Sequence, residues 1–117
     1  MTYLDDMRAT LTEALEPLGV HVTLDPSAAV PPCLLVDSTP ERILQSVCGV
    51  VRSWEATLLP PPSTDWLAAQ WLAEHLDQVR DAIDEHAGAV VEEKRAGVRP
   101  DQSGPPLPAY VLTFHAT

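Results

Sequence analysis

The alternation of apolar and polar positions is clearest in residues 47–86, where it predicts one long strand followed by one long helix. In the second half of the predicted strand, 47–59, apolar and polar residues alternate strictly. The apolar positions are Trp54, Ala56 and Leu58, and the polar ones are Ser53, Glu55 and Thr57. A period of two is typical of a strand with one buried face. The rest of the chain is expected to pack around this strand and the helix that follows it.

Three prolines, Pro60–Pro62, separate the strand from the helix. Proline has no backbone N–H to donate to a sheet, so the strand must end there. Ser63 or Thr64 then offers a hydroxyl that can cap the helix, which should run to about His86 and be ended by Gly88. Its apolar stripe, at spacings of three and four, consists of Ala68, Ala69, Leu72, Leu76, Val79 and Ile83. A helix stripe and a sheet face joined by a short hinge are expected to bury each other.

The remaining elements are shorter. The patterns predict a first helix over 2–16 and strands over 19–24, 33–36, 89–93 and 109–115. Residues 41–46 favour a loop or the edge of a strand, with a helical turn or a lead-in to the long strand as alternatives. Residues 94–108, rich in proline and glycine, predict a long loop, and loops of that length are usually functional or mobile.

The predicted order is therefore helix, strand, strand, long strand, helix, strand, strand. Because helices interleave only twice with the strands, this order indicates an α+β fold. We expect a single domain over 1–117, with one mostly antiparallel sheet and both helices packed on one face.

Composition and charge narrow the possible partners. Hydrophobic residues make up 45% of the chain and charged residues 21%, which is ordinary for a globular domain. Seventeen acidic residues against seven Lys and Arg give a net charge of −10, which disfavours tight binding to nucleic acid. No apolar run approaches the roughly 18 residues that span a bilayer, and the acidic start is unlike a signal peptide. We expect no membrane partner and a location in the cytoplasm of the cell that makes the protein.

Candidate chemistry is sparse. The four histidines (His21, His75, His86 and His115) show none of the spacings typical of metal sites. Asp77, Asp81 and Asp84 share one helix face, but a solvated acidic surface is a simpler interpretation than acid–base catalysis. Cys33 and Cys48 lie in apolar surroundings and are interpreted as buried thiols, with a disulfide as the alternative. The residues therefore predict no enzyme, no cofactor and no metal.

Five residues are candidates for an interface instead. Trp66 and Trp71 do not fit the apolar stripe of the helix, and exposed tryptophan is frequent at interface hot spots. Lys94, Arg95 and Arg99 form a basic cluster at the start of the predicted loop, on an otherwise acidic chain. Wrapping of the core edge by the tryptophans and solvation of the basic loop are the alternatives. The sharper hypothesis is that the basic cluster pairs with the acidic helix of a neighbouring copy.

The order of elements, with three local patterns, resembles the tail terminator proteins of long-tailed bacteriophages, also described as minor tail or head–tail joining proteins. The first pattern is Pro-Pro before an apolar strand, at 31–36. The second is the aromatic-x-Ala-x-Leu alternation at 54–58, and the third is the Ala-Ala-Gln-x-Leu to Asp-x-Val-Arg-x-Ala-Ile helix at 68–83. The resemblance spans nearly the whole chain.

The resemblance implies a structural virion protein at the head–tail junction, assembled in the host cytoplasm, with no catalytic residues. Copies would form a ring, usually a hexamer, that caps the tail tube and joins it to the head–tail connector protein. The acidic balance would suit a lumen through which DNA passes without specific binding. Two alternatives stay open: another phage head-completion adaptor, and a small cytoplasmic domain that binds an unknown ligand or is an enzyme of unrecognised type.

Overall fold

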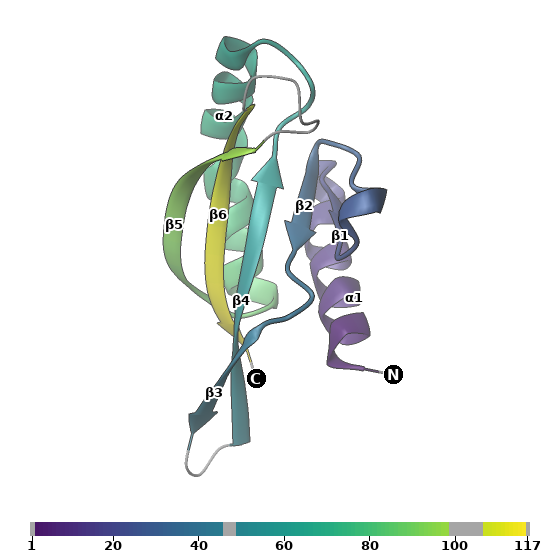
Figure 1. The fold of residues 1–117 in the computed structure, drawn as a ribbon, viewed down its shortest axis with the longest axis vertical. Helices are drawn as coiled ribbons and strands as arrows, with labels where there is room; N and C mark the ends of the chain where they lie inside the picture. The colour runs from purple at the N-terminus through teal and green to yellow at the C-terminus, as the bar shows by residue number, and fades with distance from the viewer. Residues whose placement is uncertain (1, 46–48, 99–106, 117) are drawn as a thin grey trace.

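The computed structural model describes residues 2–45, 49–98 and 107–116. Within these ranges, six strands form one sheet, and two α-helices lie against one of its faces (Figure 1). The helices are α1 (Tyr3–Leu15) and α2 (Asp65–His86), with short 3-10 turns η1 (Glu16–Leu18) and η2 (Pro26–Ala28). The strands are β1 (His21–Thr23), β2 (Cys33–Val36), β3 (Glu41–Gln45), β4 (Gly49–Leu59), β5 (Ala89–Val98) and β6 (Leu107–Ala116). The predicted α+β class is confirmed.

Strand β4 lies at the centre of the sheet. The strand order is β1-β2-β4-β6-β5, and β3 pairs with β4 beside this path. One edge of β4 is shared: residues 56–59 pair with β2 and residues 49–53 with β3. Its other edge pairs with β6. The pairing of β1 with β2 is parallel and the others are antiparallel, so the prediction of a mostly antiparallel sheet also holds.

The prediction of a loop or strand edge for residues 41–46 is corrected in part. Residues 41–45 are a complete strand, β3, so the chain has one more strand than the predicted order. Within the described residues β3 pairs with β4 alone, and Glu41 and Arg42 begin it with two charges. A short edge strand with one partner needs no alternating pattern, so the usual signal was weak. The long strand begins at Gly49, and residues 46–48 lie outside the described residues.

The predicted loop over 94–108 is also corrected in its bounds. Strand β5 continues to Val98 and β6 begins at Leu107, with Gly97 opposite Pro108 in the register. Proline usually ends a strand because it lacks an N–H. Here β4 pairs with β6 only from Tyr110 onward, so at Pro108 one side of β6 is an edge where no donor is needed. Residues 99–106 lie outside the described residues.

The core lies between the helices and one face of the sheet. Trp54 is 2% exposed and stacks on Phe114, with ring centroids 6.3 Å apart. The strict alternation predicted for β4 is confirmed, since Ala56 and Leu58 are buried beside Trp54 while Glu55 is exposed. The other large, fully buried side chains include Leu11, Leu15, Leu34, Leu72, Val79, Ile83 and Leu112. The stripe on α2 therefore packs on the sheet, as its spacing predicts.

Both helices begin at the predicted caps. The Thr2 hydroxyl accepts from the Asp5 N–H at 3.3 Å, and the Asp5 carboxylate accepts from the Thr2 N–H at 3.3 Å, which makes a capping box. In α2 it is Thr64 whose hydroxyl accepts from the Leu67 N–H, at 3.4 Å. The acidic residues in the first turn of each helix also interact favourably with the positive end of the helix dipole.

Gly88 follows the end of α2, as predicted, and its N–H donates to the Ile83 carbonyl oxygen at 3.0 Å, but it does not have the positive φ of a left-handed cap. The helix ends at His86 with Ala87 as its cap, and the positive φ of a left-handed cap is found at Gly19, after η1. A Cβ on Gly88 would collide with the main-chain carbonyl of His115 on β6. Glycine is therefore required at 88 because the chain passes directly against the sheet.

The two glycines give a matched pair of substitutions. Gly88→Ala should lower the free energy of unfolding by about 3 kcal/mol, because backbone on both sides must move. Gly19→Ala meets no atom within 4 Å and should cost about 1 kcal/mol, from its left-handed φ alone. Urea unfolding followed by circular dichroism measures both. Asn tolerates a positive φ, so Gly19→Asn should recover part of the loss while Gly88→Asn should not; recovery at 88 would refute the steric explanation.

Candidate functional site

A groove lies between α2 and the β5–β6 pair. Its volume is about 360 Å³. Its lining is mainly apolar, from Ala69, Leu72, Ala73, Leu76, Ala96, Pro108, Ala109 and Tyr110, with Asp77 and Arg95 at polar positions. One acid and one base at the margin can orient a ligand, but they form no paired acid–base arrangement.

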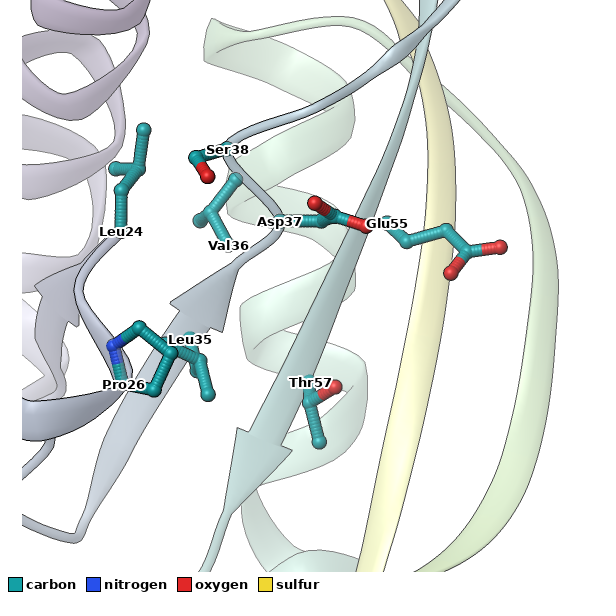
Figure 2. A pocket seen from close by; sticks show the side chains of 8 residues that line it. All are labelled: Leu24, Pro26, Leu35, Val36, Asp37, Ser38, Glu55 and Thr57. Atoms are coloured by element: carbon teal, nitrogen blue, oxygen red, sulfur yellow. The ribbon is translucent and has the colours of Figure 1, made fainter.

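A second hollow, of about 260 Å³, lies on the face of the sheet that the helices leave open (Figure 2). Leu24 and Pro26 lie on one side of it and Leu35 and Thr57 along its floor, while the Glu55 carboxylate points away from Leu24 and Pro26. It has two carboxylates, those of Asp37 and Glu55, and the Asp37 carboxylate accepts hydrogen bonds from the Thr39 N–H at 2.9 Å and the Thr39 hydroxyl at 2.8 Å. This hollow is therefore a mixed apolar and polar depression on the open face of the sheet.

Metal-ligating groups are not gathered at one place in the described part of the chain. No group of three or more His, Cys, Asp or Glu residues in it could hold a metal ion. His75 is held within its own helix, where Nδ1 lies 2.8 Å from the carbonyl oxygen of Trp71. Neither of the two described helices has the length and apolar character needed to cross a bilayer.

Trp66 lies in the first turn of α2 and is 75% exposed, with Leu67 beside it at 52%. Burying a tryptophan and a leucine normally stabilises a protein by a few kcal/mol, and this chain does not use that gain within its own fold. By helical spacing, Trp66 lies on the same side of α2 as Ala69 and Ala73, which line the groove. Trp66 therefore extends the apolar surface of the groove toward the helix N-terminus.

Trp71 has a different environment. It is half-buried, packs against the core, and stacks on His75 with ring centroids 4.2 Å apart and planes 12° apart. The side chain thus covers an edge of the core, which was the alternative interpretation of its position. Only the remaining part of its surface is available to a partner.

The predicted basic cluster is divided by the structure. Lys94 and Arg95 are exposed residues of β5 rather than of a loop, and by strand alternation they lie on opposite faces of the sheet. Arg95 lines the groove beside α2. Arg99 lies outside the described residues. The two described bases therefore do not act as one patch.

Arg80 instead ties the acidic helix to the sheet. Its guanidinium lies 3.2 Å from Asp81, 3.2 Å from Glu93 on β5 and 3.5 Å from Asp77. The hydrogen bond to Asp81, followed by that to Glu93, raises the pKa of Arg80. The pairs are largely solvated, so their value is in orientation more than in stability.

A second pair of bases became visible only in the structure. Arg42 on β3 and Arg52 on β4 are directly opposite in the strand register. The Arg52 guanidinium lies 3.9 Å from the ring centroid of Tyr3, a cation–π contact that fixes this side chain. Arg42 is exposed. These arginines are ten residues apart in the sequence, and only the register of the β3–β4 pair makes them neighbours.

Cys33 is a buried free thiol in β2. Burial raises its pKa, and only partial compensation comes from a backbone hydrogen bond at Val30. The interpretation of Cys33 as a buried thiol is confirmed. Cys48, and hence the alternative disulfide, lies outside the described residues.

Comparison with known proteins adds no family: no protein-family model matches this chain, and no curated protein matches it.

The thiol of Cys33 should resist modification. In a Cys48→Ser background, we expect a thiol reagent to react with native protein at least about 100-fold more slowly than with protein in urea, because local opening must come first. The raised pKa of Cys33 also links folding to pH. The preference of the folded state for the neutral thiol stabilises the fold below the ordinary thiol pKa, and this contribution is lost as pH rises through the folded-state pKa. Fast, pH-independent labelling of the native state would contradict the buried position.

The exposed Trp66 and the buried Trp54 should contribute very differently to the free energy of unfolding. Trp66→Ala should change the free energy of unfolding by less than about 0.5 kcal/mol, because the side chain makes little contact with its own fold. Trp54→Ala should cost about 3–5 kcal/mol through the cavity that it leaves. Thermal unfolding at matched protein concentration checks both, and a large loss for Trp66→Ala would show that it supports the monomer.

Proposed function

We propose that this chain is a structural subunit of a long-tailed bacteriophage, a tail terminator that forms a ring on the tail tube and joins it to the head–tail connector. The resemblance in element order and local patterns suggests the family. The observation that carries the proposal is one-sided packing: both helices cover one face of the sheet, and no described helix covers the other (Figure 1). A subunit that assembles with copies of itself needs such open surfaces.

The side chains of that open face suit contact with protein. Down its centre, β4 and β6 present pairs such as Ser53 opposite His115 and Thr57 opposite Val111, all partly exposed. Such mixed, partly apolar surfaces are ordinary for interfaces between proteins. Trp66 and Leu67 add an exposed apolar anchor on another part of the molecule.

The charge distribution is compatible with a ring around DNA. Strongly acidic surfaces repel phosphate, so DNA can move past them without being held. In the proposed ring, acidic side chains would line the lumen, the virion junction would be the location, and a hexamer would be the expected number of copies.

The groove beside α2 supports a second candidate, a small ligand-binding domain. Its volume of about 360 Å³ is near the lower limit of small-molecule sites, and its lining is mainly apolar. We rank it second because Arg95 and Asp77 are the two charged groups that line it, so few polar groups are available to fix an orientation.

The test is binding to tail tubes. Purified protein is mixed with assembled tubes of the same phage, and tube ends are imaged by electron microscopy. We expect ring-shaped density at one end of each tube and arrested tube growth. Trp66→Ala should reduce the fraction of capped ends about tenfold if this side chain is an anchor, while Val30→Ala, an equally exposed apolar residue elsewhere, should not.

Unmodified tube ends at saturating protein would refute the terminator. Binding to the head connector alone would favour a head-completion adaptor, and saturable binding of an apolar small molecule in the groove would favour the second candidate.

A further inference from the structure

The hairpin of β3 with the first part of β4 projects from the domain as an arm. We define the hairpin arm as residues 41–45 and 49–53. In Figure 1 it extends beyond the ends of both helices, and the chain is elongated, with extents of 48 × 27 × 24 Å. Strand β6 pairs with β4 no further than Arg52, so most of the arm has no third strand among the described residues. An isolated two-stranded hairpin has marginal stability in water, so the arm is expected to gain stability from a further contact.

The face of the arm on the helix side is positively charged. Strand alternation places Arg52 on the face that carries Trp54, and Arg42 is directly opposite Arg52. Like charges directly opposite in an antiparallel pair destabilise it. Within the described residues neither arginine has an ion pair, and Arg52 is held only by its contact with Tyr3. The pair of arginines therefore lacks the acidic partner that would offset its repulsion.

An acidic stripe is present on α2. The helix carries six acidic residues and one base, Arg80. Glu74, Asp81 and Glu85 recur at helical spacing, are exposed, and lie opposite the buried stripe of Leu72, Val79 and Ile83. Arg80 neutralises Asp81 and Asp77 in part, whereas Glu74 and Glu85 make no ion pair within the described residues.

We propose that the hairpin arm of one copy lies across α2 of a second copy, with Arg42 and Arg52 facing Glu74, Asp81 and Glu85. The arm and the acidic stripe are different surfaces of one chain, so the contact is heterologous and can repeat from copy to copy, as a ring requires. The inference deepens the proposed function and rests on it, since it supplies the contact between ring subunits.

Charge complementarity favours a second copy over nucleic acid as the partner. A phosphate backbone beside the arm would also approach the acidic residues that dominate the rest of the surface, which repel it. A second copy presents acids where the arm presents bases. Arg42 is exposed and Arg52 is partly exposed, so both side chains have surface available to such a partner.

The contact can be mapped by photo-crosslinking. A photoreactive phenylalanine derivative replaces Val50, which is partly exposed, lies by strand alternation on the same face of the arm as Arg52, and leaves both arginines in place. Unlabelled protein and ¹⁵N-labelled protein are mixed at low salt, irradiated and digested. A crosslinked product that contains one unlabelled and one ¹⁵N-labelled peptide then reports a contact between two copies. We expect such products to join the arm to the peptide that contains residues 74–85. Products confined to other surfaces, or to one copy, would overturn the inference.

A charge exchange tests the chemistry of the contact. Arg42→Glu should lower the yield of products between copies about tenfold, since the arm then carries one acid and one base and places the acid against the acidic stripe. Adding Glu74→Arg and Glu85→Arg to the same chain should restore the yield, because the new bases on the stripe then face the new acid on the arm. Arg8→Glu makes the same change of charge on α1, where Arg8 is in a solvated ion pair with Asp5, and should leave the yield unchanged; an equal loss in this control would mean that net charge, not the arm, is responsible.

The two proposals can fail separately. If wild-type protein does not cap tail tubes but the crosslinks and the charge exchange behave as expected, the terminator function is wrong and the arm contact stands. If the protein caps tubes and Arg42→Glu caps them equally well, the arm contact is wrong and the terminator function stands.

Discussion

The structure depends on the pairing of β4 with three other strands. Its eleven residues supply hydrogen-bonding partners to β2 and β3 along one edge and to β6 along the other. Because side chains alternate along a strand, this one register also decides which residues enter the core. Trp54, Ala56 and Leu58 face the helices, and a shift by one residue would place Glu55 and Thr57 there instead. The stack of Trp54 on Phe114 joins β4 to β6 on the buried side of that register.

The helices cover the sheet on one side because their stripes are narrow. The stripe of α2, from Ala68 to Ile83, is wide enough for one contact surface and leaves acids and Arg80 outside. Its C-terminal end is held close to β6 by Gly88, where any side chain would meet the carbonyl of His115. The helix therefore cannot move away from the sheet to accommodate a ligand without breaking this approach.

Charge is distributed unevenly over the surface of this fold. Acids concentrate on the outward side of α2, and Arg80 spans from them to Glu93 on β5. The projecting hairpin arm carries Arg42 and Arg52 as neighbours. A chain with a net charge of −10 resists self-association unless opposite charges are placed at the contact. The arm provides such a place, which links the uneven charge to the proposed assembly.

The sequence by itself determined the local elements with strong periodicity: the first helix with its Thr2 cap, the alternating strand around Trp54, the long helix to His86 and its buried stripe. These patterns are local, because a period of two or of 3.6 residues needs no knowledge of distant partners. The class of fold followed from the order of these elements. The exposure of Trp66, one of the candidate interface residues, was also suggested by its position off the stripe.

Other features were decided only by the tertiary structure. Strand β3 and the outer ends of β5 and β6 form because a partner strand is present, even where Pro108 or paired charges argue against a strand locally. Because residues 94 and 95 belong to a strand and not to a loop, alternation places Lys94 and Arg95 on opposite faces of the sheet. Pairing of β3 with β4 brings Arg42 beside Arg52, although ten residues separate these two arginines in the chain. The steric need for glycine at position 88 could not be seen in the sequence, because the residue that it contacts, His115, is 27 positions away. Contacts of this kind depend on register and approach between distant segments, which a linear pattern does not encode.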